Sequence, residues 1–257
     1  QLTMDEIYET FGGMVDKFYA PCKEYTFAYG RAAGQVTDDT GQMLELVTSY
    51  FEATDNVITA KGAADALLRW AEDPECFAKF AGPTSRAAII RLREGADPVA
   101  IGLERKANMG ASNGCAMKIA PAGLFHPGDL NGAIADACEI CRPTHATTIG
   151  MSAASAVAAA IAEALTPGAD LFSVYRASLY GAREGFRMAG TLGRPVAGPN
   201  VEARIKLAAG IAMKATNLED ACRTIGESVA TGRPAPETVP AAIGLMIAAG
   251  GDPLKTI

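Results

Sequence analysis

Two adjacent carboxylates form the clearest concentration of reactive groups in the chain. Asp38 and Asp39 follow Thr37 and lead directly into an apolar segment with helical spacing that begins near Gln42. Neighbouring carboxylate and hydroxyl oxygens are hard ligands of the kind that bind Mg²⁺, Mn²⁺ or Ca²⁺. Helix capping is the alternative that spacing alone favours, because Asp39 and Gln42 have capping-box spacing and acidic groups stabilise a helix N-terminus by roughly 0.3–1 kcal/mol.

A second candidate lies in the glycine-rich stretch at residues 110–121, which contains Ser112, Asn113 and Gly114 ahead of a helix-like run. Glycines beside serine and asparagine expose backbone N–H groups and small polar side chains, which is how a loop can bind phosphate oxygens. The same composition is typical of an ordinary turn, and on composition alone the turn is favoured.

Two further segments combine a polar side chain with a predicted helix start. His145, one of two histidines, precedes a long alanine-rich segment, where a lone histidine is more often structural than catalytic. Residues 82–86 place Ser85 and Arg86 after Pro83 and could hold an anion. We favour a proline-initiated helix with an exposed arginine at this position.

The elements that position these candidate residues are predicted to be helices. Apolar residues recur at three- and four-residue steps in the first half, and alanine-rich helices are predicted in the second half. Thr59 and Asn217 have the residue type and position of helix N-caps. No alternating strand pattern or fixed repeat is present, so the sequence predicts an all-α fold with one domain spanning residues 1–257. The predicted second-half helices cover residues 150–165, 171–188, 201–215, 218–229 and 239–249.

Composition argues against several classes of partner. The 257 residues are 49% hydrophobic, enough for a sizeable core, and the net charge of −6 is spread without the basic stripe that nucleic-acid binding needs. Residues 150–165 include Glu163 and are fewer than the roughly 20 apolar residues of a membrane span. Acidic residues occupy positions 5–9, where a signal peptide would be basic. We therefore expect no nucleic-acid or membrane partner and a cytoplasmic location.

The six cysteines are scattered, and Cys138 and Cys141 form the single C-x-x-C pair. A redox pair or half of a zinc site is conceivable, but no second pair has zinc-finger spacing. Cysteine is among the most frequently buried residues, so we expect free, mostly buried thiols.

Taken in order, these stretches resemble the ADP-ribosylglycohydrolase family. A Thr-Asp-Asp-Thr element followed by Asn-Gly-x-Ala-Met-basic is a specific combination, and it favours metal binding over capping at Thr37, Asp38 and Asp39. The residues that carry the resemblance are 30–31, 34–40, Met43, 112–121, 144–145 and 238–242.

The resemblance implies a compact orthogonal multi-helix bundle that hydrolyses the glycosidic bond of an ADP-ribosyl group, on a protein or a small molecule. It also implies two divalent cations, Mg²⁺ or Mn²⁺. Asp38 or Asp39 would orient a water molecule or stabilise oxocarbenium-like charge in catalysis. The implied metal ligands are Thr37, Asp38 and Asp39, and the implied substrate-binding residues are Ser112, Asn113, Gly114 and His145.

The chain also departs from the family pattern. A Gly-Asp-x-Leu/Val-Gly element ahead of residues 2–21 and a Gly-Gly-Asp-x-Asp-Thr element after residues 240–257 are both missing. Pro253 and Leu254 follow Gly-Gly-Asp at residues 250–252, so Asp252 is not assigned to metal. We expect a fragment truncated at both ends, inactive because half of its metal site is missing. The alternatives are a catalytically inactive, crystallin-like binding or structural module and a plain helical scaffold.

Overall fold

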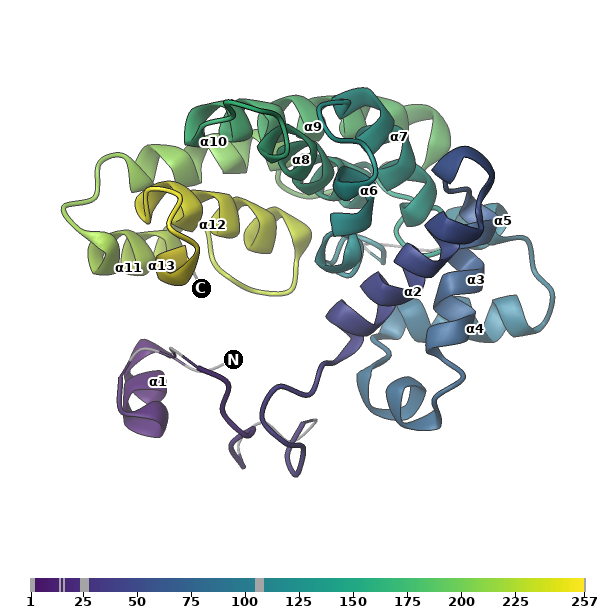
Figure 1. The fold of residues 1–257 in the computed structure, drawn as a ribbon, viewed down its shortest axis with the longest axis horizontal. Helices are drawn as coiled ribbons and strands as arrows, with labels where there is room; N and C mark the ends of the chain where they lie inside the picture. The colour runs from purple at the N-terminus through teal and green to yellow at the C-terminus, as the bar shows by residue number, and fades with distance from the viewer. Residues whose placement is uncertain (1–2, 14, 16, 24–27, 105–108, 257) are drawn as a thin grey trace.

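The computed structural model describes residues 3–13, 15, 17–23, 28–104 and 109–256, and helices dominate this part of the chain (Figure 1). Pairing of extended backbone is limited there to isolated bridges at Ser112 with Pro234 and Thr147 with Arg194. The predicted all-α fold is confirmed. The helices of the first half are α1 (Met4–Phe11), α2 (Asp38–Glu52), α3 (Ala60–Trp70), α4 (Pro83–Arg93) and α5 (Pro98–Glu104), with short helical turns η1 (Thr54–Asn56) and η2 (Cys76–Phe80).

The second half contains the longest helices, and they follow the predicted segments closely. One difference is the start of α12, which lies four residues earlier than predicted because Pro236 is accommodated in its first turn, where a backbone N–H is not needed. The elements are η3 (Ala116–Lys118), α6 (Ala120–Leu124), α7 (Leu130–Cys141), α8 (Thr148–Ala164), α9 (Leu171–Leu192), α10 (Val201–Ala212), α11 (Leu218–Ser228), α12 (Ala235–Ala248) and α13 (Pro253–Thr256).

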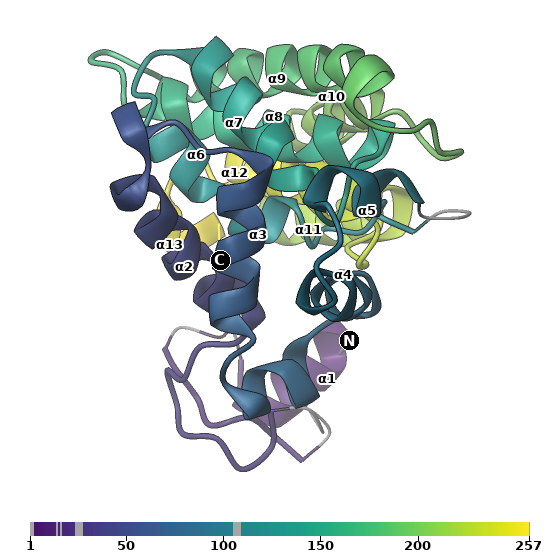
Figure 2. The same ribbon diagram turned by 90° about the vertical axis from the view of Figure 1, so that its right-hand side faces the viewer.

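Helix α8 lies at the centre of the main core, between α7 and α9, and α6 and α12 also contact it (Figure 2). Its side chains are mostly alanine, glycine and serine, and most are fully buried. A Cβ atom added to Gly181 of α9 would lie 2.2 Å from the carbonyl oxygen of Ser155 on α8. The absence of side chains at such points therefore allows the two backbones to approach closely.

A smaller core joins α3, α4 and α5 and lies beside α2. It includes Leu67, Trp70 and Ile89. Pro83 begins α4, as predicted, but Arg86 is half-buried rather than exposed. Its guanidinium donates to the Phe77 carbonyl oxygen at 2.7 Å and lies over the Phe77 ring.

Both predicted N-caps are confirmed. The Thr59 hydroxyl accepts a hydrogen bond from the Gly62 N–H, and the Asn217 side chain accepts one from the Asp220 N–H. Each cap satisfies a donor that the first helical turn leaves unpaired.

Residues 150–164 belong to α8, which is mostly buried, and Leu165 is its C-cap. No helix in the described ranges has the length and apolarity needed to cross a membrane. All six cysteines are free thiols, as predicted. Cys115, Cys138 and Cys141 are fully buried, whereas the other three are half-buried. The C-x-x-C pair is therefore part of the packed core.

Candidate functional site

The paired carboxylates lie at the N-terminus of α2, with Thr37 as its N-cap residue. Thr37 makes no side-chain capping bond; its hydroxyl instead donates to Asp39 Oδ2 at 3.3 Å. Gln42 is 2% exposed and its amide oxygen accepts a hydrogen bond from Lys118 at 2.8 Å, so it does not reach back to Asp39. The capping-box interpretation of this spacing is therefore wrong.

Negative charge is concentrated at this helix start. Burial, together with repulsion from Asp39, raises the pKa of Asp38 to about 6, although the Lys118 ammonium opposes the shift. Neither carboxylate forms an ion pair with any residue that the structure describes. Two unpaired carboxylates beside a hydroxyl have the donor chemistry that a hard divalent cation requires.

The described residues do not, however, gather three or more His, Cys, Asp or Glu side chains in positions that could hold a metal. Thr37, Asp38 and Asp39 fit a cation that keeps several water or substrate ligands, as Mg²⁺ commonly does. Asp252 is occupied elsewhere, because its carboxylate accepts the N–H groups of Leu254 and Lys255 at the start of α13.

The Ser112–Gly114 loop contacts the predicted histidine, His145. Ser112 Oγ lies 2.9 Å from His145 Nε2, and His145 Nδ1 lies 2.8 Å from the Thr144 hydroxyl. His145 is 1% exposed, whereas Ser112 and Asn113 are half-buried. The ring therefore lies behind the loop and supports it, while the serine and asparagine remain accessible.

Gly114 fits this arrangement because it has no side chain. A Cβ atom there would lie 2.9 Å from His145 Cε1 and 3.0 Å from its Nε2, closer than real Cβ atoms come to ring atoms. Any larger residue at position 114 would push the ring or the loop away. Gly114 therefore allows the loop to lie flat against the imidazole.

Backbone pairing fixes the other side of the loop. The Asn113 N–H donates to the Arg233 carbonyl oxygen at 2.8 Å, and the Ala235 N–H donates to the Ala111 carbonyl oxygen at 2.9 Å. The Thr147 hydroxyl, which caps α8, also donates to the Gly110 carbonyl oxygen at 2.7 Å. The loop is thus held between the starts of α8 and α12.

Sequence reasoning missed the contact that joins the two candidate segments. Lys118 follows the Ser112–Gly114 loop and is 4% exposed, and its Nζ atom donates to Gln42 of α2. Burial lowers the pKa of Lys118, and the neighbouring Cys141, Cys115 and Asp38 oppose this shift. A basic residue within an otherwise small and apolar run was the available signal, but its partner 76 positions away was not predictable.

A second polar network was also missed. Asp136 of α7 is buried, and its Oδ2 atom accepts a hydrogen bond from the Tyr50 hydroxyl at 2.8 Å and lies 2.8 Å from His126 Nε2. Tyr50 also stacks on Phe125, with ring centroids 4.3 Å apart. This network attaches the C-terminal half of α2 to α7, far along the helix from Asp38.

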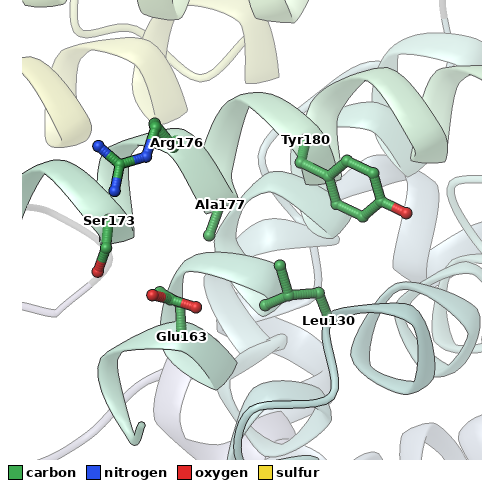
Figure 3. Close-up of a pocket in the computed structure, with 6 residues that line it drawn as sticks. All are labelled: Leu130, Glu163, Ser173, Arg176, Ala177 and Tyr180. Atoms are coloured by element: carbon green, nitrogen blue, oxygen red, sulfur yellow. The ribbon is translucent and has the colours of Figure 1, made fainter. Parts of the chain in front are cut away.

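Two surface hollows in the described structure are lined by residues other than the predicted site residues. One of about 260 Å³ is lined by Leu130, Glu163, Ser173, Arg176, Ala177 and Tyr180 (Figure 3). It lies beside the C-terminal end of α8, roughly 22 Å along that helix from Thr148 at a rise of 1.5 Å per residue. A second hollow of about 260 Å³ lies between the start of α8 and residues 195–201.

Comparison with known proteins finds relatives of this chain. The chain is similar to the uncharacterised protein YegU of Escherichia coli K12, with 29% identity over 243 residues that cover 94% of this chain and 70% of the relative. An uncharacterised protein of Archaeoglobus fulgidus is 30% identical over 161 residues, which cover 63% of this chain and 48% of that protein.

The family model for ADP-ribosylglycohydrolases matches residues 2–257, a range that includes both carboxylates, the Ser112–Gly114 loop and His145. This match supports a glycohydrolase of ADP-ribosyl groups. The chain belongs to the ADP-ribosylglycohydrolase family.

Proposed function

We propose that this protein is a divalent-cation-dependent hydrolase that cleaves the glycosidic bond of an ADP-ribosyl group on a protein or a small molecule. The observation that supports the proposal is the pair of carboxylates at the start of α2, which form no ion pair within 4.0 Å among the described residues, although the Lys118 ammonium acts on Asp38 electrostatically. Thr37, Asp38 and Asp39 would hold Mg²⁺ or Mn²⁺. When bound, such cations polarise substrate oxygens and lower the pKa of a water molecule.

The loop would bind the diphosphate and adenosine side of the substrate. The Asn113 side chain makes no hydrogen bond within the described structure, so its amide is available to donate to a phosphate oxygen. With His145 protonated at Nε2, the imidazole donates to Ser112 Oγ and leaves the serine proton for the substrate. His145 then orients Ser112, and Gly114 keeps the loop close to the ring.

In the hydrolysis, a water oxygen bonds to the anomeric carbon as the bond from that carbon to the acceptor breaks. The acceptor leaves with a proton, and free ADP-ribose is the other product. Positive charge develops at the ribosyl ring during this step, and the nearby carboxylates would stabilise it electrostatically. Asp38 and Asp39 act as ionised groups in this scheme, and no general acid is assigned.

The test is release of ADP-ribose from ADP-ribosylated peptides and from ADP-ribosyl-arginine, measured with Mg²⁺, with Mn²⁺ and with EDTA. Asp38→Asn and Asp39→Asn should each lower kcat at least a hundredfold, whereas Ser112→Ala should chiefly raise KM. Asp65→Asn, an exposed carboxylate of α3, is the matched control and should leave turnover unchanged.

Activity that persists in EDTA or in Asp38→Asn would refute the metal assignment. An inactive relative that serves as a binding module would instead bind ADP-ribose without releasing it from any substrate. A plain helical scaffold would neither bind ADP-ribose nor gain thermal stability from Mg²⁺ or Mn²⁺.

A further inference from the structure

A lysine side chain buried among apolar residues and thiols is unusual enough to require an explanation. Lys118 is 4% exposed and lies beside Cys115 and Cys141, both fully buried. Burying an ammonium group is unfavourable unless it is well paired, whereas a methionine of similar size would pack there without that penalty. Within the described structure, the acceptor that meets this ammonium is Gln42 Oε1 at 2.8 Å.

This hydrogen bond also fixes the direction of the glutamine amide. A lysine ammonium has donors and no acceptor, so the Gln42 oxygen must face it and the NH₂ group must point away. Gln42 is 2% exposed, and its Nε2 atom has no acceptor among the residues described. The amide is therefore an oriented group with an unused donor, rather than a side chain that merely fills space.

Gln42 lies close to the carboxylates along α2. Asp38 precedes Gln42 by four residues, so the two side chains lie on the same helical face about one turn apart. Lys118 comes from η3, which directly follows the Ser112–Gly114 loop. The bond thus joins α2, one turn after Asp38, to the short helix that follows the loop containing Ser112.

We propose that Lys118 and Gln42 are positioning residues, which lock the first turn of α2 and its carboxylates at a fixed place and rotation relative to the Ser112–Gly114 loop. The importance of this lock for catalysis rests on the proposed function, but the lock itself is a property of the chain without metal or substrate. Its signature is local order in α2 that depends on one buried bond.

The experiment is hydrogen–deuterium exchange measured by mass spectrometry, without metal or substrate, on peptides that cover residues 37–46 and on reference peptides from α10 and α12. Lys118→Met and Gln42→Met should each speed exchange in this segment at least tenfold, because a charge-assisted hydrogen bond is lost. Lys118→Arg should restore exchange to within about twofold of the wild type. The double variant should exchange no faster than either single variant, since both remove the same bond.

Two controls separate this role from general support of the core. Lys206→Met removes an exposed lysine paired with Glu202 on α10 and should leave residues 37–46 unchanged. Gln42→Glu retains an acceptor for Lys118 and should keep the segment protected. If Lys118→Met does not fold, the contrast between Gln42→Met and Gln42→Glu still decides the question.

The proposal is overturned if exchange rises equally in α2, α10 and α12, if the two methionine substitutions act additively, or if Gln42→Met and Gln42→Glu behave alike. Because neither metal nor substrate is present, a failure of the proposed hydrolase activity would not alter these results. Conversely, a confirmed lock in a protein that releases no ADP-ribose would refute the proposed function alone.

Discussion

Helices α2 and α8 are held in the protein by opposite means. Of the residues that α2 buries, Leu46 and Tyr50 belong to the hydrophobic core and Gln42 and Ser49 are polar. The polar groups of Gln42, Ser49 and Tyr50 each contact a charged side chain from another element. The pairs are Gln42 with Lys118, Ser49 with Arg69, and Tyr50 with Asp136.

Helix α8 instead buries small side chains on most of its surface, and it approaches α9 so closely at Gly181 and Gly185 that neither position has room for a Cβ atom. Van der Waals packing of this kind is not directional, but its high density makes the framework rigid. Hydrogen bonds to charged groups are directional, so they specify how α2 is rotated and where its first turn lies. The helix with the candidate carboxylates is thus the one whose position is fixed by named atoms.

The largest effect is expected where the close packing is broken. A Cβ atom at Gly181 would lie 2.2 Å from the Ser155 carbonyl oxygen, so Gly181→Ala must push α9 away from α8 and should lower the free energy of unfolding by about 2–3 kcal/mol. Gly190→Ala on the same helix meets open space and should raise stability by up to about 1 kcal/mol. Urea denaturation measures both, and similar values for the two variants would show that backbone approach does not determine the α8–α9 contact.

A smaller effect is expected where a polar anchor of α2 is removed. Tyr50→Phe keeps the stacking on Phe125 but removes the hydrogen bond to the buried Asp136 carboxylate, and should cost about 1.5–3 kcal/mol. Tyr175→Phe is the matched control, since this half-buried hydroxyl makes no hydrogen bond within the described part of the chain, and it should be nearly neutral. Equal stability losses in the two variants would contradict the view that α2 is held by directional bonds.

The same contrast explains what the sequence could predict. The sequence predicts the helices of the close-packed framework to within a few residues, because alanine-rich periodicity and the caps Thr59 and Asn217 are local signals. The anchors of α2 are not local: Lys118 is 76 residues from Gln42, and Asp136 is 86 residues from Tyr50. A charged residue on an apolar helical face indicates a buried partner, but spacing does not identify that partner.

The candidate site shows the same division. Family resemblance pointed to both Ser112 and His145, and the structure brings them to 2.9 Å, although their roles in substrate binding stay a prediction. Local spacing predicted a capping box between Asp39 and Gln42, which is wrong because Lys118, a distant residue, takes the glutamine. Local rules fail here because a tertiary partner competes successfully for the same side chain.

The smallest expected effect concerns the charge at the start of α2. Because burial and Asp39 raise the pKa of Asp38 to about 6, the folded chain binds that proton more tightly than the unfolded chain, whose pKa is near 3.8. The free energy of unfolding therefore falls as pH rises from about 4 to 6. Above pH 6 Asp38 is ionised in the folded chain, and the destabilisation that its charge causes is fully present.

Asp38→Asn removes this cost, so without added metal it should raise Tm at pH 8 by about 1–3 °C after allowance for solvent screening. The gain should disappear as pH falls to 4, where Asp38 is neutral in both states. Asp65→Asn, which breaks an exposed pair with Lys61, should show no such pH-dependent gain. If Asp38→Asn raises Tm equally at pH 4 and pH 8, ionised Asp38 does not destabilise the start of α2. The strongest support for a bound cation at these carboxylates would then be lost.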